Sequence, residues 1–87
     1  MNVNDIFLEH LPKIDLHGND RDMARVMVND FIDEAVKMGY LEIVIIHGIG
    51  SGILKNVVQD VLKRDKRVLS FYIDGFNNGC TVVKLKK

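Results

Sequence analysis

The chain has 87 residues, of which 47% are hydrophobic and 28% charged, and its 12 basic and 12 acidic residues leave no net charge. This length provides one hydrophobic core and excludes a second domain, and the ordinary composition with a single proline excludes a low-complexity chain. No apolar run is long enough to cross a bilayer and the first residues lack a basic leader, so we expect a cytoplasmic protein. The single cysteine, Cys80, excludes an internal disulfide and a zinc site built from several thiolates.

The charges are distributed unevenly along the chain. Residues 1–43 carry nine acidic and four basic residues, whereas residues 44–87 carry three acidic and eight basic residues. If the second half presents its basic side chains on one face, they create a local positive field; the alternative is a set of solvated cations at the ends of helices and strands. The basic residues concerned are Lys63, Arg64, Lys66, Arg67, Lys84, Lys86 and Lys87.

Residues 1–13 precede the expected domain, which covers residues 14–87. Pro12 disfavours a helix immediately before it, so we interpret residues 1–13 as an N-terminal arm or a linker. A strand is expected over 14–17, and Asp20 is a suitable helix N-cap.

Apolar side chains at three- and four-residue spacing predict a deeply packed helix that runs from Asp20 to Met38. Its main stripe is Met23, Val26, Met27, Phe31, Ala35 and Met38, widened by Ala24, Val28 and Ile32.

The remainder of the chain predicts a second helix and three more strands. The β-branched run 41–46 is typical of a central strand buried on both faces, and apolar residues from Ile53 onward repeat at helical spacing up to the basic stretch KRDKR. Strands are expected over 68–73 and 81–85, joined as a hairpin through the turn-forming DGFNNG segment.

The resulting order, β-α-β-α-β-β, predicts an α/β fold with a four-stranded mixed sheet packed against two helices in two layers. Its two strand-helix-strand units indicate parallel pairing. We expect a monomer by default, with an exposed final strand as a possible site of edge-to-edge pairing. Three aromatic residues near the chain's end are candidates for base stacking, with a core position as the alternative: Phe71, Tyr72 and Phe76.

The first chemical motif is Asp-Leu-His-Gly, at the end of the first predicted strand. Strand alternation sends Asp15 and His17 to the same face, where the carboxylate would orient the imidazole and raise its basicity for proton transfer. The alternative is a histidine of an edge strand that lies near its own acid in solvent.

The second motif, His-Gly-Ile-Gly-Ser-Gly, lies between the buried strand and the second helix. Three alternating glycines, Gly48, Gly50 and Gly52, let the backbone approach an anion, and the helix N-terminus that follows offers free N–H groups. Ser51 would act as helix N-cap or as a phosphate donor, and Lys55 would add a cation. The spacing fits neither the Walker A pattern nor the dinucleotide fingerprint, and the alternative is a tight turn without a ligand.

Together, IDLHG and HGIGSGILK resemble the two hallmarks of the Smr (small MutS-related) family, Leu-Asp-Leu-His-Gly and His-Gly-x-Gly-x-Gly. The resemblance covers residues 14–87 and extends to Ala24 and to the closing Gly-Cys-Thr-Val-Val strand. It implies a mixed α/β sheet, nucleic-acid binding and, as in several members, endonuclease activity on RNA or DNA.

The chain departs from the family pattern in three places. Ile49 replaces a small residue or Lys, Leu-Lys at 54–55 replaces Leu-Arg, and Asp-Met at 22–23 replaces an acidic pair. A lysine at position 55 keeps the charge of an arginine but not its bidentate contact with phosphate. The three candidate catalytic residues are unchanged: Asp15, His17 and His47.

These residues predict a phosphodiesterase that favours RNA over DNA. His17, oriented by Asp15, would transfer the proton, with His47 as a second proton-transfer group or phosphate ligand. The phosphate would be bound by Gly48, Gly50, Ser51, Gly52 and Lys55.

We expect no obligatory cofactor, because activation of an RNA 2′-hydroxyl needs acid-base groups and charge stabilisation alone. A divalent metal such as Mg²⁺ is the alternative, with Asp15 and Asp74 as its carboxylates. A rival hypothesis is a docking module that binds RNA, DNA or a ribosome without cutting. A protein-interaction accessory is a third, and it predicts affinity that is insensitive to salt.

Overall fold

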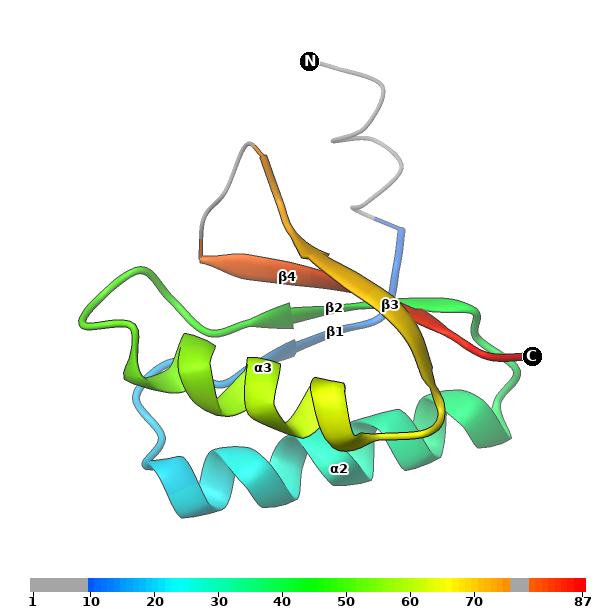
Figure 1. Cartoon of the computed structure of the whole chain (residues 1–87), viewed down its shortest axis with the longest axis horizontal. Helices are drawn as coiled ribbons and strands as arrows, with labels where there is room; N and C mark the ends of the chain where they lie inside the picture. Colours follow the sequence, from blue (N-terminus) through cyan, green and yellow to red (C-terminus); the bar gives the residue numbers. More distant parts are fainter. Residues whose placement is uncertain (1–9, 76–78) are drawn as a thin grey trace.

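A computed structural model describes residues 10–75 and 79–87. The predicted order β-α-β-α-β-β is confirmed (Figure 1). The elements are β1 (Lys13–Asp15), α2 (Arg21–Lys37), β2 (Glu42–Ile46), α3 (Ile53–Arg64), β3 (Val68–Ile73) and β4 (Cys80–Leu85). No helix in the described part of the chain is long and apolar enough to cross a membrane.

The four strands form one mixed sheet in the order β1-β2-β4-β3. β1 pairs parallel to β2, while β4 pairs antiparallel to both β2 and β3. The hairpin of the last two strands is therefore confirmed, but β4 lies between β2 and β3, so the second strand-helix-strand unit contains no direct strand pair. The expectation of an exposed final strand is wrong, because β4 is central and β3 is the edge strand on that side.

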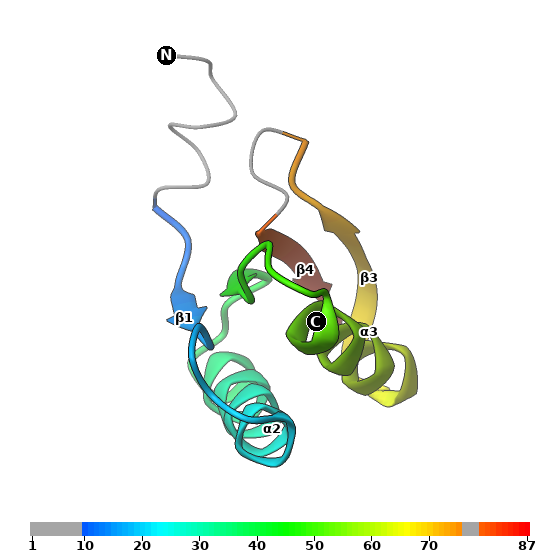
Figure 2. The ribbon, with the colours of Figure 1, turned by 90° about the vertical axis from the view of Figure 1, so that its left-hand side faces the viewer.

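Both helices cover one face of the sheet, as the two views in Figures 1 and 2 show. The core between these layers contains Leu16, Ile43, Ile45, Val83 and Leu85 from the sheet side, packed against apolar residues of both helices. Ile43 and Ile45 are fully buried, which confirms that β2 is a central strand. Since β2 is central, its C-terminal end lies in the middle of one sheet edge.

The buried face of α2 differs from the predicted stripe. The buried residues are Ala24, Val28, Ile32 and Ala35, which follow one another at four- and three-residue spacing. Met23, Val26 and Met38 lie 50%, 55% and 63% exposed, so their assignment to a deeply packed stripe is wrong. The helix carries apolar residues on more than one row, and α3 packs beside it, so the row with two small alanines is the one that approaches the core.

The opposite face of the sheet carries a second, smaller apolar cluster. Val44, Cys80 and Val82 form it, and Leu11 and Ile46 pack against it. The carbonyl oxygen of Pro12 accepts a hydrogen bond of 2.9 Å from the Val44 N–H. Residues 11–13 thus lie against or within the sheet, while residues 1–9 of the expected N-terminal arm and Phe76 fall outside the described residues.

Apart from Lys55, the basic residues of the second half do not surround the glycine-rich turn. Lys84 pairs with Glu42 at the start of β2, and the Lys86 N–H donates to the Arg67 carbonyl, so this group lies at the opposite end of the sheet from the turn that follows β2. Arg67 forms ion pairs with Asp33 and Asp65. For these positions the structure matches the alternative interpretation, that of cations at the ends of helices and strands.

Candidate phosphodiester site

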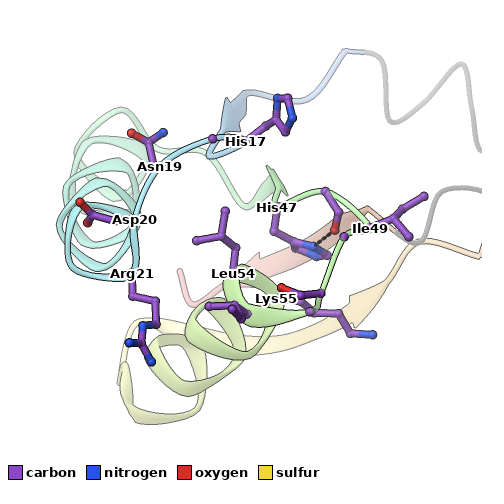
Figure 3. A pocket seen from close by; sticks show the side chains of 14 residues that line it. His17, Asn19, Asp20, Arg21, His47, Ile49, Leu54 and Lys55 are labelled. Carbon is purple, nitrogen blue, oxygen red and sulfur yellow. Dashed lines mark hydrogen bonds between the residues drawn. The ribbon is translucent and has the colours of Figure 1, made fainter.

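The two His-Gly turns meet because they follow adjacent parallel strands. β1 and β2 run in the same direction, and the Leu16 N–H donates to the Ile46 carbonyl at 2.7 Å, so both strands end at the same edge. Each turn then leads into a helix, and the two turns enclose a cavity of about 570 Å³ (Figure 3). Its lining comes from both turns and from the first residues of α2 and α3: residues 17–21 and 47–55.

The first turn is closed by its own side chains. A carboxylate oxygen of Asp15 accepts a hydrogen bond of 2.9 Å from the backbone N–H of His17. Asn19 donates from both its backbone and its side-chain nitrogen to the Leu16 carbonyl, at 3.0 and 3.2 Å. β1 ends at Asp15, so the chain turns where the sequence pattern predicted continued strand. The expected carboxylate–imidazole bond is therefore wrong: the two-residue spacing produces an Asx-type turn instead.

His17 is exposed at the mouth of the cavity, above the second turn. A Cβ added at Gly48 would lie 4.0 Å from Cδ2 of His17, so the imidazole faces the backbone of the glycine turn. No hydrogen bond or ion pair engages this imidazole within residues 10–75 and 79–87. Its nitrogens are thus available to a bound molecule.

His47 occupies a different environment, below the turn and only 4% exposed. Its Nδ1 lies 2.9 Å from the Gly48 carbonyl, the contact marked in Figure 3, and its Nε2 lies 2.8 Å from the Thr81 hydroxyl. A carbonyl oxygen only accepts, so Nδ1 carries a proton and donates it. In the neutral ring, Nε2 then accepts from the Thr81 hydroxyl. Because both nitrogens bind the protein, His47 is placed to anchor the turn.

The second turn presents backbone N–H groups to the cavity. Gly48 and Gly52 have φ values of +83° and +84°, which L side chains rarely adopt, so glycine is required there by conformation. The N-cap of α3 is Gly52, which has no side chain with which to cap the helix, so the prediction of Ser51 as N-cap is wrong. The first helical bond of α3 joins the Asn56 N–H to the Gly52 carbonyl at 3.0 Å, which leaves the N–H groups of residues 53–55 without helical partners.

Two cations border the cavity from different helices. Lys55 lies in the first turn of α3, half-buried, as the motif predicted. Arg21 begins α2 and was missed by the sequence analysis, although it follows the predicted N-cap residue directly. Asp20 caps α2 by accepting from the Met23 N–H at 2.8 Å, which confirms its N-cap assignment. The sequence did contain a signal for Arg21, because it is a basic residue directly after the predicted helix cap and close to the first motif.

The two candidate metal carboxylates lie outside the cavity lining. Burial raises the pKa of the Cys80 thiol, and the negative charges of Asp74 and Asp15 raise it further. Both carboxylates are therefore close enough to Cys80 to affect its thiol. In the part of the chain that the structure describes, no three or more His, Cys, Asp or Glu side chains gather closely enough to hold a metal ion. Neither carboxylate contributes to the cavity that His17 faces.

The chain matches the family model named Smr domain over residues 14–86. It belongs to the Smr family. It is 38% identical over 76 residues to endonuclease MutS2 of Clostridium novyi and 42% identical over 77 residues to endonuclease MutS2 of Geobacillus thermodenitrificans. These matches cover 84% and 85% of this chain but 10% of each relative, so the Smr domain described here corresponds to about a tenth of their length.

Two solved structures share the fold of this Smr domain. The Smr domain of Thermus thermophilus MutS2 superposes with a TM-score of 0.86 at 32% identity, covering 88% of this chain and 100% of that chain. YdaL, a stand-alone small MutS-related protein from Escherichia coli, superposes with a TM-score of 0.82 at 25% identity, covering 86% of this chain and 64% of that chain. The chain is thus homologous to the Smr region of endonuclease MutS2 over most of its length.

Proposed function

We propose that this Smr domain binds a nucleic-acid backbone and cleaves a phosphodiester bond, with RNA favoured over DNA. The observation that carries the proposal is the position of His17, whose exposed imidazole faces a glycine turn at the N-terminus of α3. The relatives that share this domain are named endonucleases, which supports a nucleic-acid substrate.

The glycine turn and α3 supply the contacts for one phosphate. Backbone N–H groups of residues 53–55 and the positive end of the helix dipole stabilise an anion without any side-chain rearrangement. Lys55 adds a cation at the rim, and the exposed Ser51 hydroxyl adds a neutral donor. Because Gly50 has open space around its α-carbon, the backbone can approach the phosphate closely there.

On RNA, the imidazole of His17 takes the proton of the 2′-hydroxyl, and the resulting oxygen attacks the adjacent phosphorus. The bond from phosphorus to the 5′-oxygen breaks, the 5′-oxygen takes up a proton from water, and His17 returns its proton to the solvent. The products are a 2′,3′-cyclic phosphate and a 5′-hydroxyl. Asp15 fixes the backbone that carries His17, and His47 fixes the backbone of the glycine turn at Gly48. In this proposal no cofactor is obligatory, and Mg²⁺ is the alternative that a chelator tests.

A non-catalytic docking module is the second candidate function. It is favoured by one observation, that the carboxylate of Asp15 accepts a hydrogen bond from the backbone N–H of His17 and not from its imidazole, as the sequence had predicted. In that case His17 donates a hydrogen bond to a phosphate, and its loss weakens binding without affecting any turnover.

The test compares labelled RNA and DNA of the same sequence in the presence of a chelator, with cleavage and binding measured in parallel. Replacing His17 with Ala should lower RNA cleavage by about 100- to 10,000-fold, the usual contribution of a general base, with binding largely kept. His10→Ala is the matched control, because His10 is exposed and lies outside the cavity. Salt-sensitive binding without cleavage by the wild-type protein would instead establish the docking module.

A further inference from the structure

A second hollow adjoins the cavity along the seam between α2 and α3. It shares Arg21 and Ile53 with the cavity, so the two hollows are continuous across the first turn of α3. The proposed cleavage mechanism assigns no role to it. Its lining contains two guanidinium groups, one amide and two apolar side chains: Arg21, Arg25, Asn56, Ile53 and Val57.

Cations outnumber anions along this seam. Asp60 accepts from Arg25 at 2.9 Å and from Arg64 at 3.1 Å, so a single carboxylate serves two guanidinium groups. The hydrogen bond from Arg25 lowers the pKa of Asp60, so this carboxylate stays ionised and one positive charge remains in excess.

Arg21 adds a further positive charge to the seam. Its guanidinium has no hydrogen bond or ion pair to any side chain in the described ranges.

Two other carboxylates lie near Arg21 but do not line the seam. Asp20 and Asp22 border a neighbouring hollow, which shares Arg21 and Arg25 with the seam. The carboxylate of Asp20 already accepts from the Met23 N–H as the cap of α2. The hollow between the helices therefore presents guanidinium and amide donors without a carboxylate in its lining.

We propose that this seam binds the phosphate next to the scissile one, so that the nucleic-acid strand crosses the N-terminus of α3 from the glycine turn toward Arg21 and Arg25. The inference rests on the proposed function and adds a subsite to it. Guanidinium groups bind phosphate through two parallel hydrogen bonds, and Arg25, half-exposed, keeps donors beyond the one that meets Asp60. Ile53, 51% exposed between the two hollows, provides an apolar surface for the sugar that joins the two phosphates.

The proposed subsite requires an extended substrate. A strand that occupies both hollows carries at least two successive phosphates, and a single mononucleotide would fill only the glycine turn. The effect of Arg21 on binding should then depend on one particular phosphate of the strand, which a general electrostatic effect would not produce.

The experiment measures binding of a short single-stranded RNA and a series in which one phosphate at a time is replaced by an uncharged methylphosphonate. Arg21→Ala should weaken binding of the unmodified RNA by about 10- to 100-fold, the range expected for lost bonds to a charged group. It should also reduce the slope of log affinity against log salt by about 0.7, the value for one phosphate contact on a single strand.

The decisive comparison is the coupling between protein and RNA. At one position beside the cleaved bond, the methylphosphonate should weaken binding to the wild-type protein but not to Arg21→Ala. Arg21→Lys should keep part of the salt dependence and lose most of the affinity, since it keeps the charge without the bidentate geometry. Lys66→Ala is the control, an exposed cation between α3 and β3 and thus far from α3's N-terminus, and it should bind as the wild type does.

The outcomes separate the two proposals. If Arg21→Ala folds, binds RNA with wild-type affinity and responds to every methylphosphonate as the wild type does, the subsite is wrong while phosphate binding at the glycine turn stands. A wild-type protein that binds no RNA at low salt overturns both.

Discussion

The hydrogen bond between His47 and Thr81 connects the glycine turn to the centre of the sheet, and its removal should destabilise the fold. Thr81 is fully buried in β4 and its hydroxyl lies 2.8 Å from Nε2 of His47. Thr81→Val keeps the shape of the side chain but leaves this nitrogen buried without a donor. Such a loss costs about 1–3 kcal/mol in the free energy of unfolding. For a domain of this size, each kcal/mol lowers the midpoint of thermal unfolding by about 4–8 °C.

The assay is urea and thermal unfolding of four proteins: wild type, Thr81→Val, His47→Leu and the double variant. If the hydrogen bond is the source of the effect, Thr81→Val should cost little more once His47 has been replaced, with a coupling of about 1 kcal/mol or more. Equal stability of Thr81→Val and wild type, or strictly additive effects in the double variant, would show that this hydrogen bond does not stabilise the fold.

Other positions give independent expectations. Gly50→Ala should weaken RNA binding but leave stability unchanged, because Gly50 has no positive φ and no atom lies within 4 Å of an added Cβ. Gly52→Ala should lower the free energy of unfolding by about 1–2 kcal/mol, because Gly52 has a φ of +84°. The hydrogen bond from Arg67 lowers the pKa of Asp65 below its ordinary value of 3.8. The stability that the ionised Asp65 contributes is therefore fully present above pH 3.8 and is lost as the pH falls through the lowered pKa. Asp65→Asn should make the free energy of unfolding less dependent on pH in this acidic range. Burial raises the pKa of Cys80, so at pH 8 iodoacetamide should alkylate it far more slowly in the folded protein than in urea.

Local sequence patterns were sufficient to predict the element order and the meeting of the two motifs. The run at 41–46 identified the central strand, and glycines after each of the first two strands marked the turns. Adjacent parallel strands end at one edge, so the proximity of His17 to the Gly48 turn followed from the topology.

Features that depend on distant residues were not predictable in this way. The insertion of β4 beside β2 depends on antiparallel pairing between Ile46 and Cys80, far apart in the sequence. The two ring contacts of His47 involve a neighbour, Gly48, and a residue 34 positions away, Thr81. Spacing alone could not show that the burial of His47 comes from the last strand.

A second group of errors came from local geometry that strand alternation and helical spacing do not capture. The carboxylate of Asp15 meets the backbone N–H of His17 because β1 ends there, and the Asx turn takes the oxygen that strand alternation had assigned to the imidazole. In α2, the spacing rule alone admits several apolar rows, and packing against α3 selects the one that contains Ala24 and Ala35.

The most direct test of the central claim is single-turnover cleavage of RNA in chelator by wild type and His17→Ala, each saturated with substrate so that binding differences cancel. We expect the wild-type protein to form a product with a 2′,3′-cyclic phosphate, and one 2′-deoxy sugar at the cleaved position to block this cleavage. The rate should be lower by about 100-fold or more in the variant. Equal rates for the two proteins, or cleavage that persists at the 2′-deoxy position, would contradict the role assigned to His17.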